Sequence, residues 1–247
     1  MLNSLGEYQK ILILGGKSDL ALSLINEIPL SEDSEVLLAG NNISNFKTPP
    51  ELSKLNIERI DINFRDIEKA KFLVASAFDT GDVDLVIIAY AILGDEISQL
   101  DPSIYENVLH TNFYSQALML NQVYNRMALQ HHGQILLISS VAGVRPRKRN
   151  FVYGTSKSSV DFLVQGLQKL THDSNISLTI LRPGFVHTKM TTGIPPAPFA
   201  TDKVTVAKIA ARALRNKSRI AYAPRILFFV MPILKILPER IFRLLDR

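Results

Sequence analysis

Short runs of apolar residues, separated by polar or glycine-containing segments, recur along most of the chain. The run at 83–89 (VDLVIIA) is almost entirely apolar or β-branched, which is typical of a strand buried on both faces of a parallel sheet. Similar short segments bounded by turn residues predict six strands in all, at 10–14, 35–39, 56–60, 83–89, 134–139 and 176–181.

Helices are predicted between several of these strands, at 20–28, from 101 to about 132, and at 151–171. The long middle helix begins with Asp101 and Pro102, a cap residue followed by a proline at the first helical position. Strands that alternate with helices in a chain of 247 residues predict one α/β domain over 1–247. We expect a doubly wound parallel sheet with helices on both faces.

The composition is that of an ordinary globular protein, with 47% hydrophobic and 21% charged residues. There is no cysteine, which excludes disulfides, thiolate metal sites and cysteine nucleophiles. We interpret His110, His131 and His132 as structural or surface residues and, since no His-x-x-x-His spacing occurs, predict no metal site. The N-terminal residues contain no apolar core, so we expect no signal peptide and a cytoplasmic protein.

Basic residues are concentrated in the C-terminal part of the chain. Residues 202–247 contain 11 of the 28 Lys and Arg but only 3 of the 23 Asp and Glu, so the net charge of +5 belongs to this part. Because the rest of the chain has no arginine-rich arm and no basic stretch interleaved with aromatics, nucleic acid is not expected as a partner.

The end of the chain combines apolar and basic character. The segment 225–237 (RILFFVMPILKIL) is strongly apolar, is interrupted by Pro232 and Lys235, and is followed by the amphipathic PERIFRLLDR. It is too short to span a bilayer. Two interpretations remain open: peripheral contact with the inner face of a membrane, or packing on a partner subunit or over a substrate cleft.

The first predicted strand runs into a glycine-containing turn and then into a helix. At such a turn the pyrophosphate of a dinucleotide binds against the free N–H groups of the helix start. Gly16 would let the backbone approach the ligand, and Ser18 would cap the helix. Ala21 stands where the last glycine of the fingerprint is expected, so a plain strand–helix turn remains the alternative. The residues assigned here to a cofactor are Gly15, Gly16, Lys17, Ser18, Asp19 and Leu20.

The end of the second predicted strand bears on the choice of cofactor. An acidic residue here would bind the adenine ribose of NAD, and a nearby arginine would bind the 2′-phosphate of NADP. Asn41 does neither decisively, whereas Lys17 in the glycine turn is able to face that phosphate. The expected cofactor is NADPH or NADH, with Lys17 favouring NADPH.

Tyr153 and Lys157 are four residues apart in the helix predicted at 151–171, so they lie on one helix face. A lysine ammonium at that distance stabilises a phenolate, so we expect the pKa of Tyr153 to fall below its usual value of about 10. Tyr153 would then act as an acid or base, while Ser140 holds a carbonyl or hydroxyl oxygen beside it. Because YxxxK alone is a weak motif, a surface tyrosine next to a solvated lysine is the alternative.

A serine thirteen residues before Tyr153, at a strand end, and an Arg-Pro-Gly after the next strand resemble the short-chain dehydrogenase/reductase family. The resemblance implies a Rossmann-type fold, reduction of a carbonyl group with a nicotinamide cofactor, and assembly into dimers or tetramers. It also implies a catalytic set of Ser140, Tyr153, Lys157 and Asn112, in which Asn112 distorts the long helix and holds a water for proton transfer.

The same resemblance implies further contacts with the cofactor. Asp61 and Ile62 would contact the adenine, Val186 and Thr188 would contact the nicotinamide half, and 190–200 would form a substrate lid. After the fourth strand this chain has Ala-Tyr-Ala-Ile where the family usually has Asn-Asn-Ala-Gly. The expected cofactor contacts outside the glycine turn are Asn41, Asp61, Ile62, Ala89, Tyr90, Ala91, Tyr153, Lys157, Pro183, Gly184, Val186 and Thr188.

Four cations in five positions precede the helix that carries Tyr153. Arg145, Arg147 and Arg149 would bind an anionic substrate, because arginine forks match phosphate oxygens. A solvated loop is an equally good interpretation of the pattern.

Three strings narrow the resemblance within the family: GGKSDLAL, AYAILGD and RPGFVHTKMTTGIPPAPFAT. Together with the apolar and basic tail, they are similar to reductases of a 2-keto pentose carried on decaprenyl phosphate, which serve cell-wall arabinan synthesis beside a flavin oxidase. Two alternatives stay open. One is a short-chain reductase of another lipid-linked or bulky ketone, and the other is a nucleotide-binding regulatory protein without catalysis.

Overall fold

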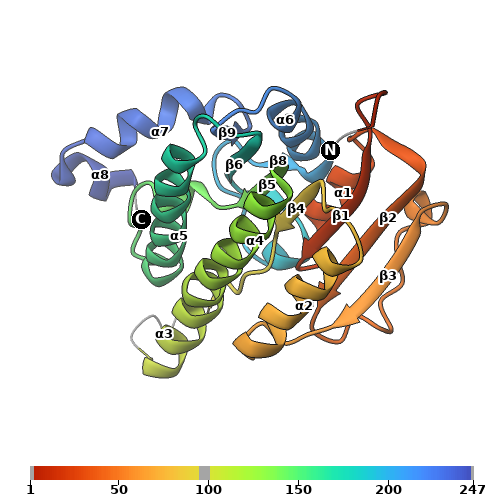
Figure 1. The fold of residues 1–247 in the computed structure, drawn as a ribbon. Helices are drawn as coiled ribbons and strands as arrows, with labels where there is room; N and C mark the ends of the chain where they lie inside the picture. Colours follow the sequence, from red (N-terminus) through yellow and green to blue (C-terminus); the bar gives the residue numbers. More distant parts are fainter. Residues whose placement is uncertain (1–2, 95–100, 246–247) are drawn as a thin grey trace.

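A seven-stranded sheet, in which every strand is parallel to its neighbours, forms the centre of the computed structural model (Figure 1). The structure describes residues 3–94 and 101–245. From one edge to the other, the strands are β3 (Asn56–Asp61), β2 (Leu30–Gly40), β1 (Tyr8–Leu14), β4 (Leu85–Ile88), β5 (Gly133–Ile138), β6 (Ile176–Pro183) and β9 (Ile220–Ala223).

Helices cover both faces of this sheet. Those on one face are α2 (Ile67–Asp79), α4 (Gln116–Gln130) and α5 (Phe151–Leu170), and those on the other are α1 (Asp19–Ile25) and α6 (Lys203–Arg215). Successive strand residues alternate between the two cores: Leu12 and Leu14 pack under the first set of helices, and Ile11 and Ile13 under the second. The predicted doubly wound α/β fold is confirmed.

The six predicted strands are all present, with ends shifted by a few residues; β2, for example, begins at Leu30 rather than near Glu35. Helices α2 and α6 and the edge strand β9 were not predicted from the sequence. The strand order reverses beside β1, since β2 and β4 follow β1 in the chain but lie on its two opposite sides. Ligands of open α/β sheets bind at the carboxyl ends of the strands at such a reversal.

The long helix predicted from 101 to about 132 is interrupted around Asn112, where the family resemblance implies a distortion. It consists of α3 (Pro102–Leu109), a π-helical segment η2 (His110–Ser115) and α4. Asp101 caps α3 as predicted, since its carboxylate accepts from the backbone N–H of Ser103 at 2.8 Å. A π-helical turn inside an α-helix often marks a functional position.

The chain after β6 builds one side of the molecule. Two short strands, β7 (Val186–His187) and β8 (Thr201–Asp202), pair with each other and frame the segment between them. Beyond β9, the segments α7 (Leu227–Ile236) and α8 (Glu239–Leu245) extend past α5 at the end of the molecule (Figure 1). Within 3–94 and 101–245, no helix has the length and apolar character needed to cross a membrane. The remaining short turns of helix are η1 (Pro50–Leu52), η3 (Val141–Gly143) and η4 (Lys189–Thr191).

Candidate active site

A cleft of about 1090 Å³ opens at the carboxyl ends of the central strands, where the strand order reverses. Most of the residues that we assigned to cofactor or chemistry line it. They are Gly15, Lys17, Ser18, Asp19, Leu20, Asn41, Ala89, Tyr90, Ala91, Ser140, Arg147, Arg149, Tyr153, Lys157, Pro183, Gly184, Val186 and Thr188.

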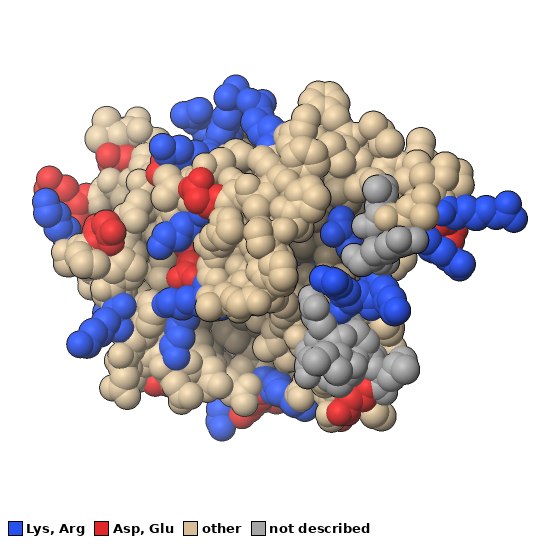
Figure 2. Space-filling model, turned by 180° about the vertical axis from the view of Figure 1, so that it is seen from behind, with Lys and Arg blue, Asp and Glu red and all other residues tan. Residues whose placement is uncertain are grey.

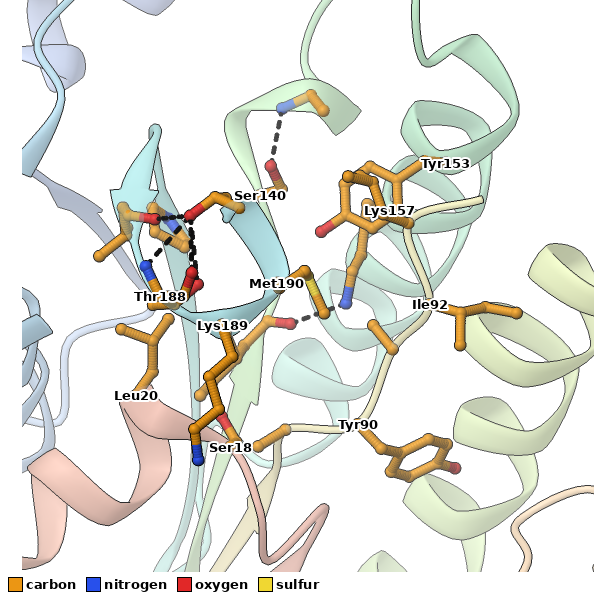
Figure 3. Close-up of a pocket in the computed structure, with 18 of the residues that line it drawn as sticks. Ser18, Leu20, Tyr90, Ile92, Ser140, Tyr153, Lys157, Thr188, Lys189 and Met190 are labelled. Carbon is orange, nitrogen blue, oxygen red and sulfur yellow. Dashed lines mark hydrogen bonds between the residues drawn. The ribbon is translucent and has the colours of Figure 1, made fainter. Parts of the chain in front are cut away.

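Ser140, Tyr153 and Lys157 lie together on one side of this cleft (Figure 3). Ser140 caps η3, where its Oγ accepts from the backbone N–H of Ala142 at 3.1 Å. Two glycines bring this turn against α5: a Cβ on Gly143 would lie 2.8 Å from the Ser158 backbone nitrogen, and one on Gly154 2.7 Å from the Ala142 carbonyl oxygen. The close approach places the Ser140 hydroxyl beside the Tyr153 phenol.

Lys157 is fixed by the strand next to it. Its Nζ donates to the carbonyl oxygen of Ile138 at the end of β5, at 2.9 Å, and lies 5.8 Å from the centre of the Tyr153 ring. The side chain is buried, with the residue 2% exposed. Burial lowers the pKa of Lys157 to about 8, and the negative charge of Asp161 opposes this effect.

The expected lowering of the Tyr153 pKa by Lys157 is wrong for this structure. Burial raises the pKa of Tyr153 to about 12, and the hydrogen bond with the Ser140 hydroxyl offsets only part of that rise. Desolvation wins because the phenol is enclosed by the cleft wall. Tyr153 therefore holds its proton at neutral pH, which is the form that gives a proton to an alkoxide.

Asn112 lies behind the cleft wall, fully buried in η2. Its Oδ1 accepts from the backbone N–H of Ile92 at 2.8 Å, and its Nδ2 donates to the Ile92 carbonyl at 2.7 Å and to Ser156 Oγ at 3.2 Å. Asn112 does not line the cleft, whereas Ile92 does. The side chain thus ties the π-helical turn to the segment after β4.

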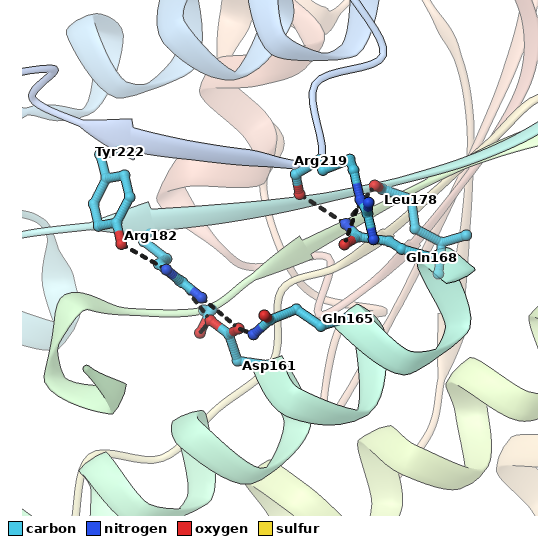
Figure 4. A network of polar contacts seen from close by, with 8 residues as sticks. Asp161, Gln165, Gln168, Leu178, Arg182, Arg219 and Tyr222 are labelled. Carbon is cyan, nitrogen blue, oxygen red and sulfur yellow. Dashed lines mark hydrogen bonds and ion pairs between the residues drawn. The ribbon is translucent and has the colours of Figure 1, made fainter. Parts of the chain in front are cut away.

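A buried polar network supports α5 from the sheet (Figure 4). Arg182 of β6 binds the carboxylate of Asp161 through Nε and Nη2, each at 2.7 Å, and donates through Nη1 to the Tyr222 hydroxyl of β9 at 2.5 Å. Ser139 and Gln165 also donate to Asp161. Sequence reasoning missed this network, although the Arg-Pro-Gly string that contains Arg182 was noticed as a motif.

The glycine turn is held against β2 and β4. The backbone N–H groups of Gly15 and Gly16 both donate to the Ala39 carbonyl, at 2.8 and 2.9 Å. Gly15 has φ +105°, and a Cβ there would lie 2.5 Å from the Tyr90 backbone nitrogen. Contrary to the prediction, Gly16 does not line the cleft. It packs on Leu38, so a side chain would have no room here, which explains why a glycine is required.

The start of α1 fits a dinucleotide phosphate. Ser18 caps the helix as predicted, accepting from the Ala21 N–H at 3.4 Å. Asp19 and Leu20, in the first helical turn, line the cleft, and the first N–H groups of a helix have no acceptor within the helix. The Asp19 carboxylate accepts instead from the backbone N–H of Lys189 at 2.9 Å. This bond ties the residue just before the expected lid to the start of α1.

Asp61 and Ile62, for which an adenine contact is expected, do not line the cleft in this structure. The Asp61 carboxylate accepts from the backbone N–H of Ile43 at 2.5 Å and from the hydroxyl and N–H of Ser44. The bonds with Ser44 and Ile43 hold the pKa of this carboxyl below its usual range. The residues that do reach the cleft after β3 are Asn63, Phe64 and Arg65.

Tyr90 lines the cleft, but only a small part of its aromatic ring is exposed there. The ring stacks on Phe64, with centroids 3.9 Å apart, and its hydroxyl bonds to Ser115 Oγ at 2.9 Å. In Figure 3 the ring points away from the Tyr153 and Lys157 side chains. Burial accordingly raises the pKa of Tyr90, and the residue serves the site as a support.

The three arginines before α5 separate into two groups. Arg145 faces the C-terminal helices: its guanidinium donates to the Lys235 carbonyl and to Glu239 Oε2, each at 2.9 Å, and lies 4.4 Å from the centre of the Phe242 ring. The expected substrate contact of Arg145 is therefore wrong. Arg147 and Arg149 line the cleft.

The segment expected as a lid borders the cleft. Its apolar and proline residues line the opening. These residues are Met190, Ile194, Pro195, Pro196, Ala197 and Pro198. Besides Arg147, Arg149 and Lys157, three further cations line the cleft from other walls: Lys17, Arg65 and Lys189. The cleft thus combines the Ser140, Tyr153 and Lys157 side chains with a surplus of positive charge.

Comparison with known proteins agrees with this geometry. Residues 9–198 match the family model of the short chain dehydrogenases. An uncharacterized oxidoreductase of Mycobacterium tuberculosis H37Rv is 29% identical over 243 residues, which cover 96% of this chain and 97% of the relative.

Two solved structures share the fold. A short chain dehydrogenase of Burkholderia cenocepacia in complex with NADP has a TM-score of 0.78 at 14% identity, covering 95% of this chain and 94% of that one. A 3-oxoacyl-[acyl-carrier protein] reductase of Brucella melitensis in complex with NAD has a TM-score of 0.71 at 16% identity, covering 90% and 98%. Because the family model spans most of the chain, this protein belongs to the short-chain dehydrogenase/reductase family of oxidoreductases.

Proposed function

We propose that this protein reduces a ketone to a secondary alcohol with NADPH or NADH. The observation that carries the proposal is the convergence of Ser140, Tyr153 and Lys157 on one cleft wall, across from a helix start suited to phosphate. A reduced nicotinamide, when bound, supplies the hydride for the carbonyl carbon. The complexes of the two structural neighbours with NADP and NAD support this cofactor class.

Tyr153, Ser140 and Lys157 supply and stabilise the proton transfer that completes the reduction. Tyr153 carries the proton at neutral pH and gives it to the alkoxide oxygen, so that one hydride and one proton convert C=O to CH–OH. The Ser140 Oγ already accepts from Ala142, which leaves its own hydrogen for the substrate oxygen. Lys157 holds positive charge near the phenolate that Tyr153 becomes and is placed to bind the nicotinamide ribose.

Asn112 supports the proton supply indirectly. It keeps the π-helical turn against Ile92, and we assign to this turn the position of a water path that returns a proton to Tyr153. Ser156, one residue before Lys157, bonds to the same amide and joins the turn to α5.

The cofactor choice follows from charge at the adenosine end of the cleft. The residues that line the cleft at the end of β2, Gly40 and Asn41, carry no acid, and Lys17 and Arg65 lie on the neighbouring turns. The nearby Asp61 carboxylate is bound by Ile43 and Ser44. Arg65 is oriented by Glu106, at 3.2 Å. We therefore propose NADPH as the preferred cofactor, with a lower kcat/KM for NADH and a loss of this preference in Lys17→Glu.

The substrate proposed is a ketone with a phosphate and a bulky or apolar group. Arg147 and Arg149 would bind the phosphate, and the proline-rich lid would enclose the ketone-bearing part. The most specific candidate is the 2-keto pentose on decaprenyl phosphate, supplied by a flavin oxidase, as the sequence resemblance implies. Another lipid-linked or bulky ketone is the alternative. We expect the protein to act as a homo-oligomer.

The proposal is tested by following NAD(P)H oxidation with a polyprenyl-phosphate 2-keto pentose, a ketoacyl thioester and a neutral bulky ketone. Tyr153→Phe should reduce turnover by about 10³-fold, while the affinity for NADPH, measured by calorimetry, changes little. Wild-type turnover in Tyr153→Phe would exclude the mechanism. Binding of NADPH without turnover of any ketone would favour the nucleotide-sensing alternative.

A further inference from the structure

The outer face of α7 is apolar. Phe229, Ile233 and Ile236 follow one another at intervals of four and three residues, so they share a helix face, and they are 66%, 60% and 82% exposed. The inner face of the same helix is formed by Leu227 and Met231, which are buried. A helix that turns its apolar stripe to solvent has a binding partner or an aggregation liability.

The following helix continues this surface. Ile241 and Leu244 of α8 are 50% and 64% exposed, whereas Phe242 between them is buried. Arg240 and Arg243 lie beside these apolar residues on the same short helix and are exposed. We name the apolar residues of α7 and α8 together the outer stripe: Phe229, Ile233, Ile236, Ile241 and Leu244.

The orientation of the outer stripe is built into the fold. Arg145, 15% exposed, donates to the carbonyl of Lys235 and to Glu239 and covers the Phe242 ring, so one side chain fastens both helices. At the other end, Leu227 packs against Gly184, leaving no room there for a Cβ. The stripe is therefore held outward by contacts on the inner side.

Helix α6 presents a basic row. Lys208, Arg212 and Arg215 follow one another at i, i+4 and i+7, so they share a helix face, and Lys217 follows them. All four are exposed, and within the described part of the chain none forms an ion pair. They line a hollow of about 580 Å³, in which the one acidic residue, Glu27, faces these four cations.

The basic row and the outer stripe lie along the same edge of the molecule. In Figure 1, α6 and α7 both run along the upper edge, and Figure 2 shows Lys and Arg side chains clustered at that edge next to an uncharged surface over α7. Residues 203–244 contain ten Lys and Arg and one acidic residue, Glu239. Apolar side chains beside unpaired cations match an interface of lipid tails and anionic headgroups.

We propose that the α6–α8 edge docks on the surface of a membrane that contains anionic lipids. The outer stripe enters the headgroup boundary, while the basic row binds lipid phosphates. A second copy of the chain is a poorer occupant, because a two-fold contact would bring the same basic flanks together. Glu27 and Glu239 are too few to pair these cations, and Glu239 is already bound to Arg145 and Arg243. The positive charge of this edge thus favours an anionic lipid surface over a second copy of the chain.

This inference deepens the proposed function, on which its link to a lipid-borne substrate rests. Gly184 and Phe185 line the cleft, and Leu227 at the start of α7 contacts Gly184. A membrane bound at α7 would therefore lie close to the cleft wall formed after β6. A ketone carried on a lipid phosphate could reach the site without leaving its membrane.

The test is cosedimentation of the full chain with vesicles of phosphatidylcholine, with and without phosphatidylglycerol. We expect binding only to the anionic vesicles, and release by salt. Phe229→Ser should weaken binding about fivefold, whereas Phe72→Ser, at a 74% exposed position of α2, should leave it unchanged. Arg212→Glu/Arg215→Glu should weaken binding by at least tenfold, and Lys47→Glu/Lys54→Glu, with the same change in charge, should have a much smaller effect.

Each outcome decides the inference separately from the proposed reductase activity. Equal binding to neutral and anionic vesicles, or no binding, would overturn it even if Tyr153-dependent turnover is present. A change of molecular mass in light scattering of Phe229→Ser, with vesicle binding intact, would make the outer stripe a contact between copies. All these variants should reduce a soluble ketone at the wild-type rate, and their thermal transitions verify that they fold.

Discussion

Arg182 and Asp161 form a two-point ion pair between β6 and α5, with both N–O distances at 2.7 Å (Figure 4). The two side chains are 13% and 6% exposed, so each charge depends on the other for its solvation. Asp161 lies one helical turn after Lys157 and is the charge that opposes the effect of burial on that lysine. The pair therefore joins the stability of the sheet to the chemistry of the site.

Asp161→Asn should destabilise the protein by about 3 kcal/mol, because the Arg182 charge would remain buried without its partner. It should also lower the pKa of Lys157 further, since the opposing charge is lost. Urea unfolding and the pH profile of kcat measure the two effects. In Asp161→Leu/Arg182→Met most of the stability should return while the shift of the pH profile remains; a profile identical to wild type would contradict the coupling.

Lys157→Met should stabilise the protein at neutral pH while abolishing turnover. Burial lowers the pKa of Lys157 from 10.5 to about 8, so the unfolded chain binds this proton more tightly than the folded protein does. Below pH 8 wild type carries the whole cost, about 3 kcal/mol, and between pH 8 and 10.5 the cost disappears as stability rises with pH. Unfolding curves of both proteins from pH 6 to 11 should converge near the upper end; a constant difference would contradict the assignment.

Gly15→Ala should destabilise the fold by about 3 kcal/mol or more and abolish cofactor binding. The new Cβ would meet the Tyr90 backbone at 2.5 Å, where no side chain is free to move away. Gly81 is the matched control, because it also has a positive φ, +139°, but has no atom within 4 Å of the added Cβ. Gly81→Ala should destabilise the protein by only about 1 kcal/mol. Equal losses of stability in the two variants would show that the cost comes from backbone strain and not from the contact with Tyr90.

Arg147→Ala and Arg149→Ala should each raise KM for a phosphate-bearing ketone by about tenfold, and leave KM for a neutral ketone unchanged. Arg145→Ala serves as the internal comparison, because it faces Glu239 and Phe242 rather than the cleft. Its KM values should be normal, while proteolysis of the α7–α8 segment becomes faster. A raised KM in Arg145→Ala alone would reverse the assignment of the three arginines.

The sites that the sequence located are those set by local spacing. Tyr153 and Lys157 share a helix face whatever surrounds them, and a glycine turn after a buried strand is bound to reach the carboxyl edge of a parallel sheet. The cap residues Ser18 and Asp101 act within their own turns and were found for the same reason. Motifs of this kind require no knowledge of distant contacts.

Sequence reasoning did not find the contacts that depend on a distant partner. Arg145 and Arg147 are neighbours in one basic string, yet only the folded protein shows that Arg145 fastens the C-terminal helices. The Asp61 carboxylate accepts a hydrogen bond from the backbone N–H of Ile43, and the residues next to Asp61 in the chain do not indicate this contact. The predicted direction of the Tyr153 pKa shift was wrong for the same reason. Burial raises this pKa, and its effect exceeds that of Lys157, which the spacing places beside the phenol.

The amino-acid sequence by itself determined the α/β class, most strands and the identity of the Ser140, Tyr153 and Lys157 set, since these depend on period and spacing along the chain. Tertiary structure alone decided the edge strand β9, the Asp161–Arg182 pair and the outward face of α7. The physical reason is that burial and charge pairing are properties of a residue's surroundings. Those surroundings come from segments far apart in the chain, which only folding brings together.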